Sequence, residues 1–185
     1  MPLLILDRDG VINQDSDDYI RSLADWHPVP GSIEAIARLC AGGYRVAIAT
    51  NQSGLGRGYF GLDELEAIHA ELNRLVEEAG GTLAGIFYCP HLPDAGCDCR
   101  KPATGLLAAM EAELAESPRD AWFVGDSLKD LQAAQAYGCR PALVRTGKGR
   151  GTEAKLAAGG SGLTAPEAIP VFDNLASCAE HILST

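Results

Sequence analysis

Two aspartates, Asp7 and Asp9, follow directly on a short apolar run near the start of the chain. Carboxylates this close repel each other unless a cation lies between them, and Mg²⁺ prefers oxygen ligands of this kind. The same D-x-D-G pattern is also common in turns at strand ends. Alone, the pair leaves both a magnesium site and an ordinary turn open.

A second candidate segment, T-N-Q-S-G-L-G-R-G, spans residues 50–58. Thr50 offers a hydroxyl group, the next residues offer backbone N–H groups, and Arg57 offers a forked positive charge suited to phosphate. Glycine-rich loops are often only flexible, and no Walker A sequence occurs in the chain. Three glycines would let the main chain approach a ligand closely: Gly54, Gly56 and Gly58.

Two further segments add charge. Lys101 precedes a predicted helix and could neutralise a phosphoryl oxygen as a point charge. Asp126 follows another apolar run and could complete a magnesium site with the two aspartates of the D-x-D-G pattern. Asp130, one helical turn on, could brace that site. A solvated basic residue and a helix cap are the ordinary alternatives for Lys101 and Asp126.

Four metal-binding side chains fall within the segment 89–99: Cys89, His91, Cys97 and Cys99. Three thiolates and one imidazole form the ligand set of a closed structural zinc site, with no position left for catalysis. The alternative, three unrelated thiols beside a histidine, is much less consistent with this spacing. We therefore predict a structural Zn²⁺ that orders a loop with almost no apolar side chain except Leu92.

The hydrophobic pattern predicts the scaffold for these residues. Apolar runs predict strands at 3–6, 45–49, 83–88, 121–124, 141–144 and 171–172. Helical patterns lie at 32–40, 104–116 and 129–137, from a cap at Asp63 to about 79, and from a cap at Asp173 or Asn174 to 183. The glycine-rich segment 147–162 is expected to be mobile in part.

Alternating strands and helices predict an α/β fold, a doubly wound, Rossmann-like parallel sheet, in a single domain over residues 1–185. Ligands of such sheets bind at the carboxyl ends of the strands. Asp7, Thr50, the Cys-rich segment and Asp126 all follow predicted strands, so we expect them to meet at one edge.

The composition of the chain limits the classes of molecule that it can bind and the compartment that suits it. The chain has 185 residues and a formal net charge of −10, which argues against a nucleic-acid groove or an anionic membrane as partner. No apolar segment approaches a membrane span, and the first residues lack a signal-peptide pattern. Six cysteines without a disulfide pattern suit a reducing compartment. We expect a cytoplasmic monomer.

Order, spacing and strand-end placement of these motifs resemble the haloacid dehalogenase-like (HAD) phosphatases, from residue 3 to about 149. The matching motifs are D-R-D-G at 7–10, T-N-Q at 50–52, the lysine at 101 and G-D-S-x-K-D at 125–130. The resemblance implies that Asp7 is a nucleophile that forms an aspartyl-phosphate and that Asp9 is the general acid and base. Thr50 and Lys101 would then hold the phosphoryl group.

The same resemblance implies a catalytic Mg²⁺ bound by Asp7, the backbone carbonyl of Asp9 and Asp126. It also indicates a core without a separate cap, since 43 residues separate Asp7 from Thr50 and 51 separate Thr50 from Lys101. The predicted helices, strand and Cys-rich segment already fill both intervals. An uncapped site is open and would accept a fairly large or multiply charged substrate.

The D-R-D-G, T-N-Q-S-G-x-x-R-G and C-x-H…C-x-C-R-K-P motifs together resemble the heptose bisphosphate phosphatases. The histidinol-phosphatase branch has a closely similar opening. The first resemblance implies release of the C7 phosphate of D-glycero-D-manno-heptose 1,7-bisphosphate, in ADP-heptose synthesis for lipopolysaccharide. Histidinol phosphate or another small sugar phosphate is the alternative substrate. A phospho-receiver module and a zinc-knuckle nucleic-acid binder are alternatives of other classes, and the net charge disfavours the second.

Substrate contacts are carried over from the same resemblance. The acidic segment is expected to contact sugar hydroxyls through Asp15, Ser16, Asp17, Asp18 and Tyr19, although a solvated acidic loop is the ordinary alternative. The phosphate site is expected to be lined by Thr50, Asn51, Gln52 and Ser53, with Arg57. Arg100 would contact the sugar or its remote phosphate. The five-residue spacer 92–96 is shorter than in several relatives and could change one wall of the pocket.

Overall fold

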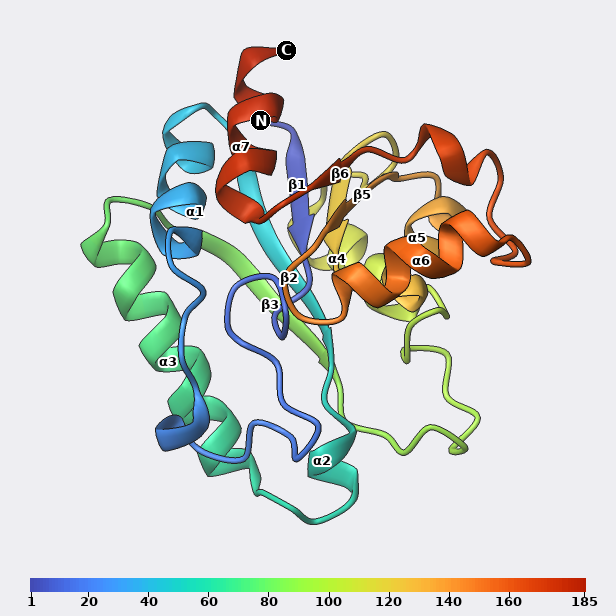
Figure 1. Cartoon of the computed structure of the whole chain (residues 1–185). Coiled ribbons are helices and arrows are strands. Elements are labelled where there is room, and N and C mark those ends of the chain that lie inside the picture. The colour runs from blue at the N-terminus through green and yellow to red at the C-terminus, as the bar shows by residue number, and fades with distance from the viewer.

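Six parallel strands form one sheet in the computed structural model, which describes residues 1–185 (Figure 1). The strand order is β3-β2-β1-β4-β5-β6. The chain therefore winds outward from β1 in both directions, and the switch point lies between β1 and β4. This confirms the predicted doubly wound sheet. The strands are β1 (Leu3–Leu6), β2 (Arg45–Asn51), β3 (Leu83–Cys89), β4 (Trp122–Gly125), β5 (Arg140–Val144) and β6 (Val171–Phe172).

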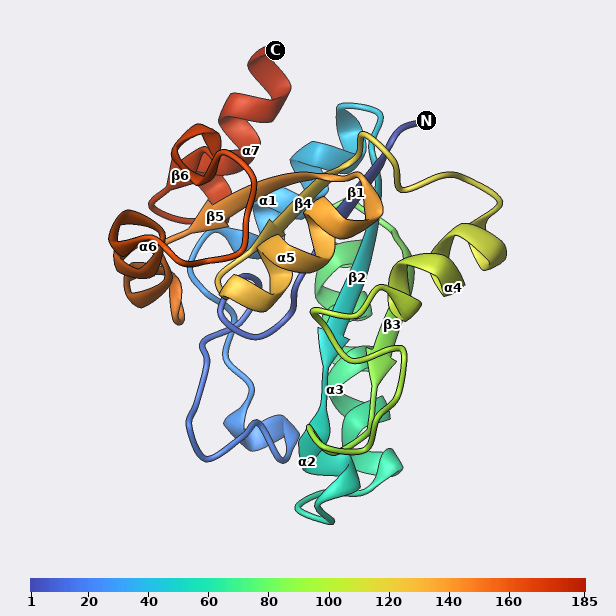
Figure 2. The same cartoon turned by 90° about the vertical axis from the view of Figure 1, so that its right-hand side faces the viewer.

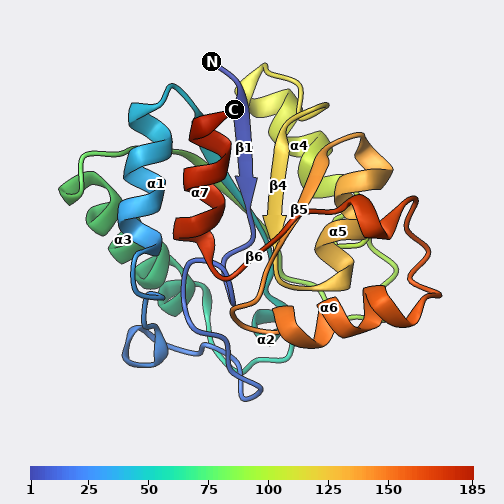
Figure 3. The ribbon, with the colours of Figure 1, turned by 45° about the horizontal axis from the view of Figure 1, so that its top comes forward.

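Helices cover both faces of the sheet, as Figures 1 and 3 show. One face carries α1 (Ser32–Ala41), α3 (Leu62–Glu78) and α7 (Leu175–Ser184), and the other carries α4 (Gly105–Leu114) and α5 (Leu128–Tyr137). Helix α6 (Gly149–Ala158) follows β5, and short α2 (Ser53–Gly56) follows β2. Two 3₁₀ turns complete the chain, at Leu23–Asp25 and Pro166–Ala168.

Strand β1 is buried on both faces, which explains its unbroken apolar sequence. Leu4 and Leu6 pack into the core beneath α1, α3 and α7. Leu3 and Ile5 pack into the opposite core, beneath α4 and α5. The period-2 alternation of a strand thus divides one tetrapeptide between two cores, and it fixes the point from which Asp7 emerges.

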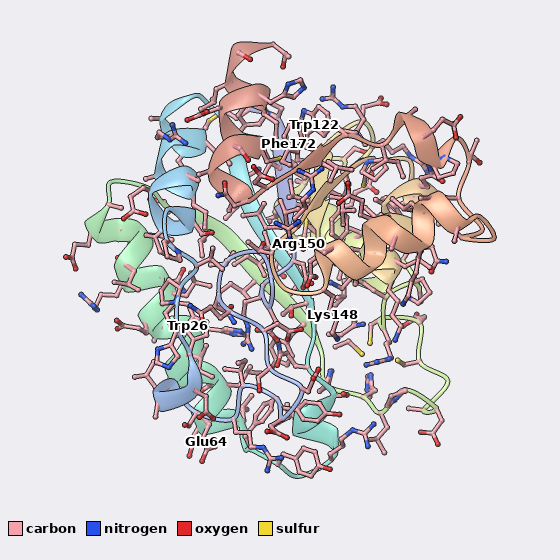
Figure 4. The ribbon with its side chains drawn as sticks, viewed as in Figure 1. Trp26, Glu64, Trp122, Lys148, Arg150 and Phe172 are labelled. Atoms are coloured by element: carbon pink, nitrogen blue, oxygen red, sulfur yellow. The ribbon has the colours of Figure 1, made fainter.

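The two ends of the sheet differ. Both termini lie at one end, and the loops that follow β1, β2 and β3 lie at the other (Figure 2). Figure 4 places Trp122 and Phe172 near α7 at the end with the termini, whereas Lys148 lies toward the opposite end. Polar strand-end residues therefore gather away from the termini. None of the helices is both long and apolar enough to span a membrane.

The glycine-rich segment, expected to be mobile in part, contains a helix that the sequence did not predict, since residues 149–158 form α6. A Cβ on Gly149 would lie 1.7 Å from the carbonyl oxygen of Val144, so glycine lets the helix start against β5. Thr152 Oγ1 donates a hydrogen bond to the carbonyl oxygen of Asp126 at 2.7 Å. Glycine at position 149 thus permits close packing of the helix against the strand.

The predicted cap of α3 is wrong. The helix begins at Leu62, and Glu64 Oε2 accepts a hydrogen bond from the backbone N–H of Gly61 at 2.9 Å. Asp63 therefore lies inside the first turn, where its charge still favours the helix N-terminus. The cap of α7 is Asn174, one of the two residues predicted, and its side chain accepts a hydrogen bond from the N–H of Ser177.

Candidate active site

A buried charge network lies at the carboxyl ends of β1 and β4. Asp7, Lys101 and Asp130 are 8%, 3% and 1% exposed. The Nζ of Lys101 donates to Asp7 Oδ1 at 3.0 Å, to Asp130 Oδ1 at 2.6 Å and to the carbonyl oxygen of Ala49 at 2.8 Å. The ammonium group therefore uses all three of its donors. We call Asp7, Lys101, Asp126 and Asp130 the carboxylate centre.

The carboxylate centre holds three acidic groups against one ammonium group. Burial and the Asp130 charge raise the pKa of Asp7 well above its usual value, although Lys101 opposes this. The same two causes raise the pKa of Asp126 to about 7. Burial would lower the pKa of Lys101, but Asp130 and Asp7 outweigh it and raise that pKa. The electrostatics thus favour binding of a further cation.

The hydrogen bonds of the centre distinguish candidate metal ligands from bracing groups. Carboxylate oxygens of Asp7, Asp126 and Asp130 lie within 4.8 Å of one another. Both oxygens of Asp130 are engaged, Oδ1 by Lys101 and Oδ2 by the N–H groups of Asp126 and Ser127 and the Ser127 hydroxyl. Asp7 Oδ2, Asp126 Oδ1 and the Asp9 carbonyl oxygen accept no hydrogen bond. These hard oxygen donors fit Mg²⁺, with Asp130 as a brace.

Two glycines shape the pocket around Asp126. A Cβ on Gly10, whose φ is +87°, would lie 2.0 Å from Asp126 Oδ2, and one on Gly147 would lie 2.3 Å from the same atom. The backbone N–H of Lys148 donates to that oxygen at 2.9 Å. Any larger residue at either glycine would displace the carboxylate.

Asp9 lies beside the centre but has its own partners. Its Oδ1 accepts hydrogen bonds from Arg8 Nε at 2.8 Å and Asn13 Nδ2 at 2.9 Å, and its Oδ2 accepts from Gln52 Nε2 at 3.1 Å. Burial would raise the pKa of Asp9, but the Arg8 charge and the three hydrogen bonds outweigh it and lower that pKa. The carboxylate of Asp9 is thus oriented independently of Lys101.

The T-N-Q segment connects these groups. Thr50 Oγ1 accepts a hydrogen bond from Gln52 Nε2 at 3.0 Å, which leaves the hydroxyl proton free to donate. The Asn51 amide donates to the backbone carbonyl of Lys101 at 3.1 Å and accepts from its N–H at 3.0 Å. The Asn51 and Gln52 side chains thus position neighbouring groups, whereas the sequence suggested only that they line a phosphate site.

A pocket of about 800 Å³ opens over the carboxylate centre. Two of the predicted contacts do not line it. Asp18 is exposed, and Arg57 lies with its guanidinium carbon 5.9 Å from the centre of the Tyr19 ring. The pocket brings together these predicted residues: Asp7, Asp9, Asp15, Ser16, Asp17, Tyr19, Thr50, Asn51, Gln52, Ser53, Arg100, Lys101, Asp126 and Asp130.

The glycines of residues 50–58 have a role that the sequence did not predict. A Cβ on Gly54 would lie 2.4 Å from the Phe60 ring, and one on Gly56 would lie 2.5 Å from the carbonyl oxygen of Pro90. These two glycines let protein segments approach each other, and their role beside a ligand stays a prediction. Gly58 adopts a φ of +75°, which glycine tolerates best.

Three lysines of the pocket rim were not among the predicted site residues: Lys129, Lys148 and Lys155. Lys148 Nζ lies 3.8 Å from Asp15 Oδ2. Burial and the charges of Arg100 and Lys148 lower the pKa of Lys129, which indicates a cluster of positive charge. Lys129 falls within the predicted G-D-S-x-K-D motif. Lys155 can be assigned to the pocket only once residues 149–158 are known to form α6.

Residues 89–99, which we call the Cys–His loop, begin at the end of β3 and carry the four metal-binding side chains; the course of the loop is visible in Figure 2. Their donor atoms all lie within 4.8 Å of one another. Cys99 Sγ lies 3.1 Å from both Cys89 Sγ and His91 Nδ1, and Cys97 Sγ lies 3.7 Å from Cys89 Sγ. Such separations suit the edges of a small tetrahedral site, so the loop could hold one metal ion.

Comparison with known proteins gives consistent matches. A family model described as HAD-hydrolase-like matches residues 98–178, and one described as polynucleotide kinase 3 phosphatase matches residues 3–137. D-glycero-beta-D-manno-heptose-1,7-bisphosphate 7-phosphatase of Pseudomonas aeruginosa is 54% identical over 98% of this chain and 97% of its own length. The enzyme of the same name from Neisseria meningitidis serogroup B is 48% identical over 99% and 95%.

Solved structures similar to this chain belong to the same kind of enzyme as these relatives. A D,D-heptose 1,7-bisphosphate phosphatase from B. bronchiseptica, complexed with magnesium and phosphate, superposes with a TM-score of 0.91 at 47% identity. The match covers 100% of this chain and 99% of that one. The Burkholderia thailandensis enzyme of the same name superposes with a TM-score of 0.74 at 41% identity, and both chains are covered completely.

Proposed function

Because the chain belongs to the HAD-like hydrolases, among the heptose bisphosphate phosphatases, we propose that it removes the C7 phosphate of D-glycero-D-manno-heptose 1,7-bisphosphate. The reaction is phosphomonoester hydrolysis and would serve ADP-heptose synthesis for lipopolysaccharide. The observation that carries the proposal is the carboxylate centre at the floor of an open pocket, with a separate carboxylate, Asp9, beside it. The location in the cytoplasm and the monomeric state stay predictions.

Asp7 is the proposed nucleophile. Its Oδ2 accepts no hydrogen bond, and the side chain lines the pocket floor. Attack on phosphorus forms the Asp7–phosphate bond as the bond from phosphorus to the sugar oxygen breaks. Mg²⁺ held by Asp7, Asp126 and the Asp9 carbonyl would reduce the repulsion between the carboxylate and the phosphate.

Lys101 and Thr50 would stabilise the transferring group in different ways. The donors of Lys101 are all engaged, so it contributes a fixed positive charge rather than a free N–H. The hydroxyl of Thr50 has a free proton and can donate directly to a phosphoryl oxygen. Their separate attachments make the phosphate site rigid before substrate binds.

Asp9 is the proposed acid and base. When protonated it donates to the departing sugar oxygen, and the resulting carboxylate then removes a proton from the water that hydrolyses the Asp7–phosphate bond. The proton that leaves in the first step is thus recovered in the second. Its hydrogen bonds to Arg8, Asn13 and Gln52 hold the carboxylate beside the nucleophile without involving Lys101.

The rim of the pocket supports a second phosphate on the substrate. Arg100 lines the pocket, and its buried Nη1 has no hydrogen-bond partner within the protein. Lys129 and Lys148 lie on the same pocket, so two anionic groups can be bound at once. Because the curated relatives are named for the β anomer, we assign the β anomer as the preferred substrate.

The test is phosphate release with Mg²⁺ from the α and β heptose bisphosphates and from histidinol phosphate. We expect β turnover to exceed α turnover by about tenfold or more, with histidinol phosphate slower still. Turnover of histidinol phosphate alone would assign the other substrate, and no turnover of either heptose bisphosphate would refute the proposal.

The Cys–His loop is proposed to hold structural Zn²⁺, since its soft ligand set leaves no open position. Zinc would fix the loop that carries Arg100 and Lys101 into the pocket. Elemental analysis of the purified protein should find about one zinc per chain, and a content far below that would contradict the assignment.

A further inference from the structure

Arg8 is the residue between the two aspartates of the first motif, and it is completely buried. Its Nε donates to Asp9 Oδ1 at 2.8 Å. Its Nη1 lies 3.1 Å from Nε2 of His69, a residue of α3 that belongs to none of the motifs. A guanidinium group only donates, so His69 must accept in this contact.

We propose that His69 is a positioning residue for proton transfer, acting through Arg8 on the carboxylate of Asp9. The inference rests on the proposed role of Asp9 as acid and base. It assigns a task to a helix, α3, that contributes no side chain to the pocket itself.

The contact restricts the orientation of Arg8. One hydrogen bond through Nε leaves the guanidinium group free to tilt, whereas a second contact at Nη1 fixes its plane. The remaining nitrogen, Nη2, is buried without a partner, so His69 is the one side chain that holds the outer end of the group. Asn13 and Gln52 also hold Asp9, so loss of His69 should loosen the carboxylate without releasing it.

His69 is well suited to accept. Burial and the Arg8 charge lower its pKa to about 4, so the imidazole is neutral at neutral pH and Nε2 keeps a free lone pair. Its neighbours Leu65, Ile68 and Leu72 anchor α3 in the core, and the ring lies 6.0 Å from that of Tyr88. The acceptor is thus held on a rigid element.

The experiment compares His69→Leu with His69→Gln, whose amide oxygen can still accept from Arg8. Two substrates are used with each variant, the heptose bisphosphate and p-nitrophenyl phosphate. The sugar alkoxide needs a proton to leave, whereas p-nitrophenolate leaves without one. The readout is kcat/KM, which covers only the steps up to departure of the leaving group.

We expect His69→Leu to lower kcat/KM for the sugar phosphate about tenfold and that for p-nitrophenyl phosphate less than about threefold. His69→Gln should recover most of the loss. His181→Leu is the matched control, since His181 packs on Trp122 and Phe172 far from the pocket, and it should change neither value.

An equal loss on both substrates, or equal loss in His69→Gln and His69→Leu, would overturn the proposal and leave His69 a packing residue. The test of His69 does not depend on whether a heptose bisphosphate is the natural substrate. If the wild-type chain hydrolyses a different sugar phosphate, that compound replaces the bisphosphate and the same ratio still tests His69.

Discussion

The carboxylate centre and the Cys–His loop are both clusters of metal-binding side chains at the same end of the sheet, but they are held differently. The carboxylate centre is buried at strand ends and fixed by hydrogen bonds from distant segments. The Cys–His loop is mostly exposed, and its one large apolar side chain, Leu92, is 37% exposed. Only Cys89, at the end of β3, is buried.

The two clusters differ in what fixes the positions of their side chains. The core positions the carboxylate centre whether or not a cation is bound, and the cost is repulsion among carboxylates of raised pKa. The Cys–His loop has little apolar contact to order it, so its geometry must depend on the bound metal. Removing a carboxylate should therefore lower catalysis and raise metal-free stability at the centre, whereas removing a ligand should lower both at the loop.

The largest expected effect is that of Asp7→Asn. Loss of the nucleophile should lower phosphate release by at least about 10⁴-fold. The metal-free variant should nevertheless melt at a higher temperature than metal-free wild type, because one repelling carboxylate is gone. Mg²⁺ should raise the melting temperature of the wild type and much less that of the variant. A variant that melts lower than wild type without metal would contradict the claimed repulsion.

Lys101→Met removes the positive charge of the same centre. The change leaves the buried carboxylates of Asp7 and Asp130 without their cation, which should lower the free energy of unfolding by about 3–5 kcal/mol. Urea unfolding measures this loss. Lys155→Met is the control, since Lys155 lies exposed on the pocket rim and should leave the unfolding midpoint unchanged. An equal midpoint for both variants would mean that the centre is not held by Lys101.

The same contrast explains what the sequence could and could not predict. Asp7, Thr50 and Asp126 were predictable because each follows an apolar run, and parallel strands end at one edge. The Cys–His loop was predictable because its ligands are close in sequence. The role of His69 was not, because it depends on the rotation of α3 about its axis and on a contact 61 residues away.

Irregular segments were predicted least well. Glycine composition indicated partial mobility for residues 147–162 and gave no sign of α6, which spans residues 149–158 and begins where Gly149 packs against the carbonyl of Val144. Arg57 was expected at the phosphate and instead lies over Tyr19. In both cases the sequence shows which residue is present, but its conformation depends on how distant segments pack against each other.

A smaller effect is expected from Cys97→Ser, which removes one ligand of the Cys–His loop. Loosening of the loop should displace Arg100 and raise KM for the bisphosphate about tenfold, with a smaller change in kcat because Asp7 and Asp9 belong to other segments. Steady-state kinetics with Mg²⁺ measure both values. Cys40→Ser is the control, since Cys40 is a half-buried cysteine of α1 outside the loop, and it should leave KM unchanged. A fall in kcat with unchanged KM would mean that the loop acts on the chemical step instead.

The smallest expected change is in thiol labelling rather than in catalysis. Burial raises the pKa of Cys139 and of Cys178 to about 12, so the reactive thiolate is scarce at either position at pH 8. Iodoacetamide should therefore leave both unmodified with or without a zinc chelator. The three loop cysteines should be protected while metal is bound and labelled after chelation, with half-buried Cys40 labelled equally in both states. Peptide mass mapping separates the sites. Loop cysteines that stay protected after chelation would mean that the loop is ordered without a metal, and the contrast with the carboxylate centre would then disappear.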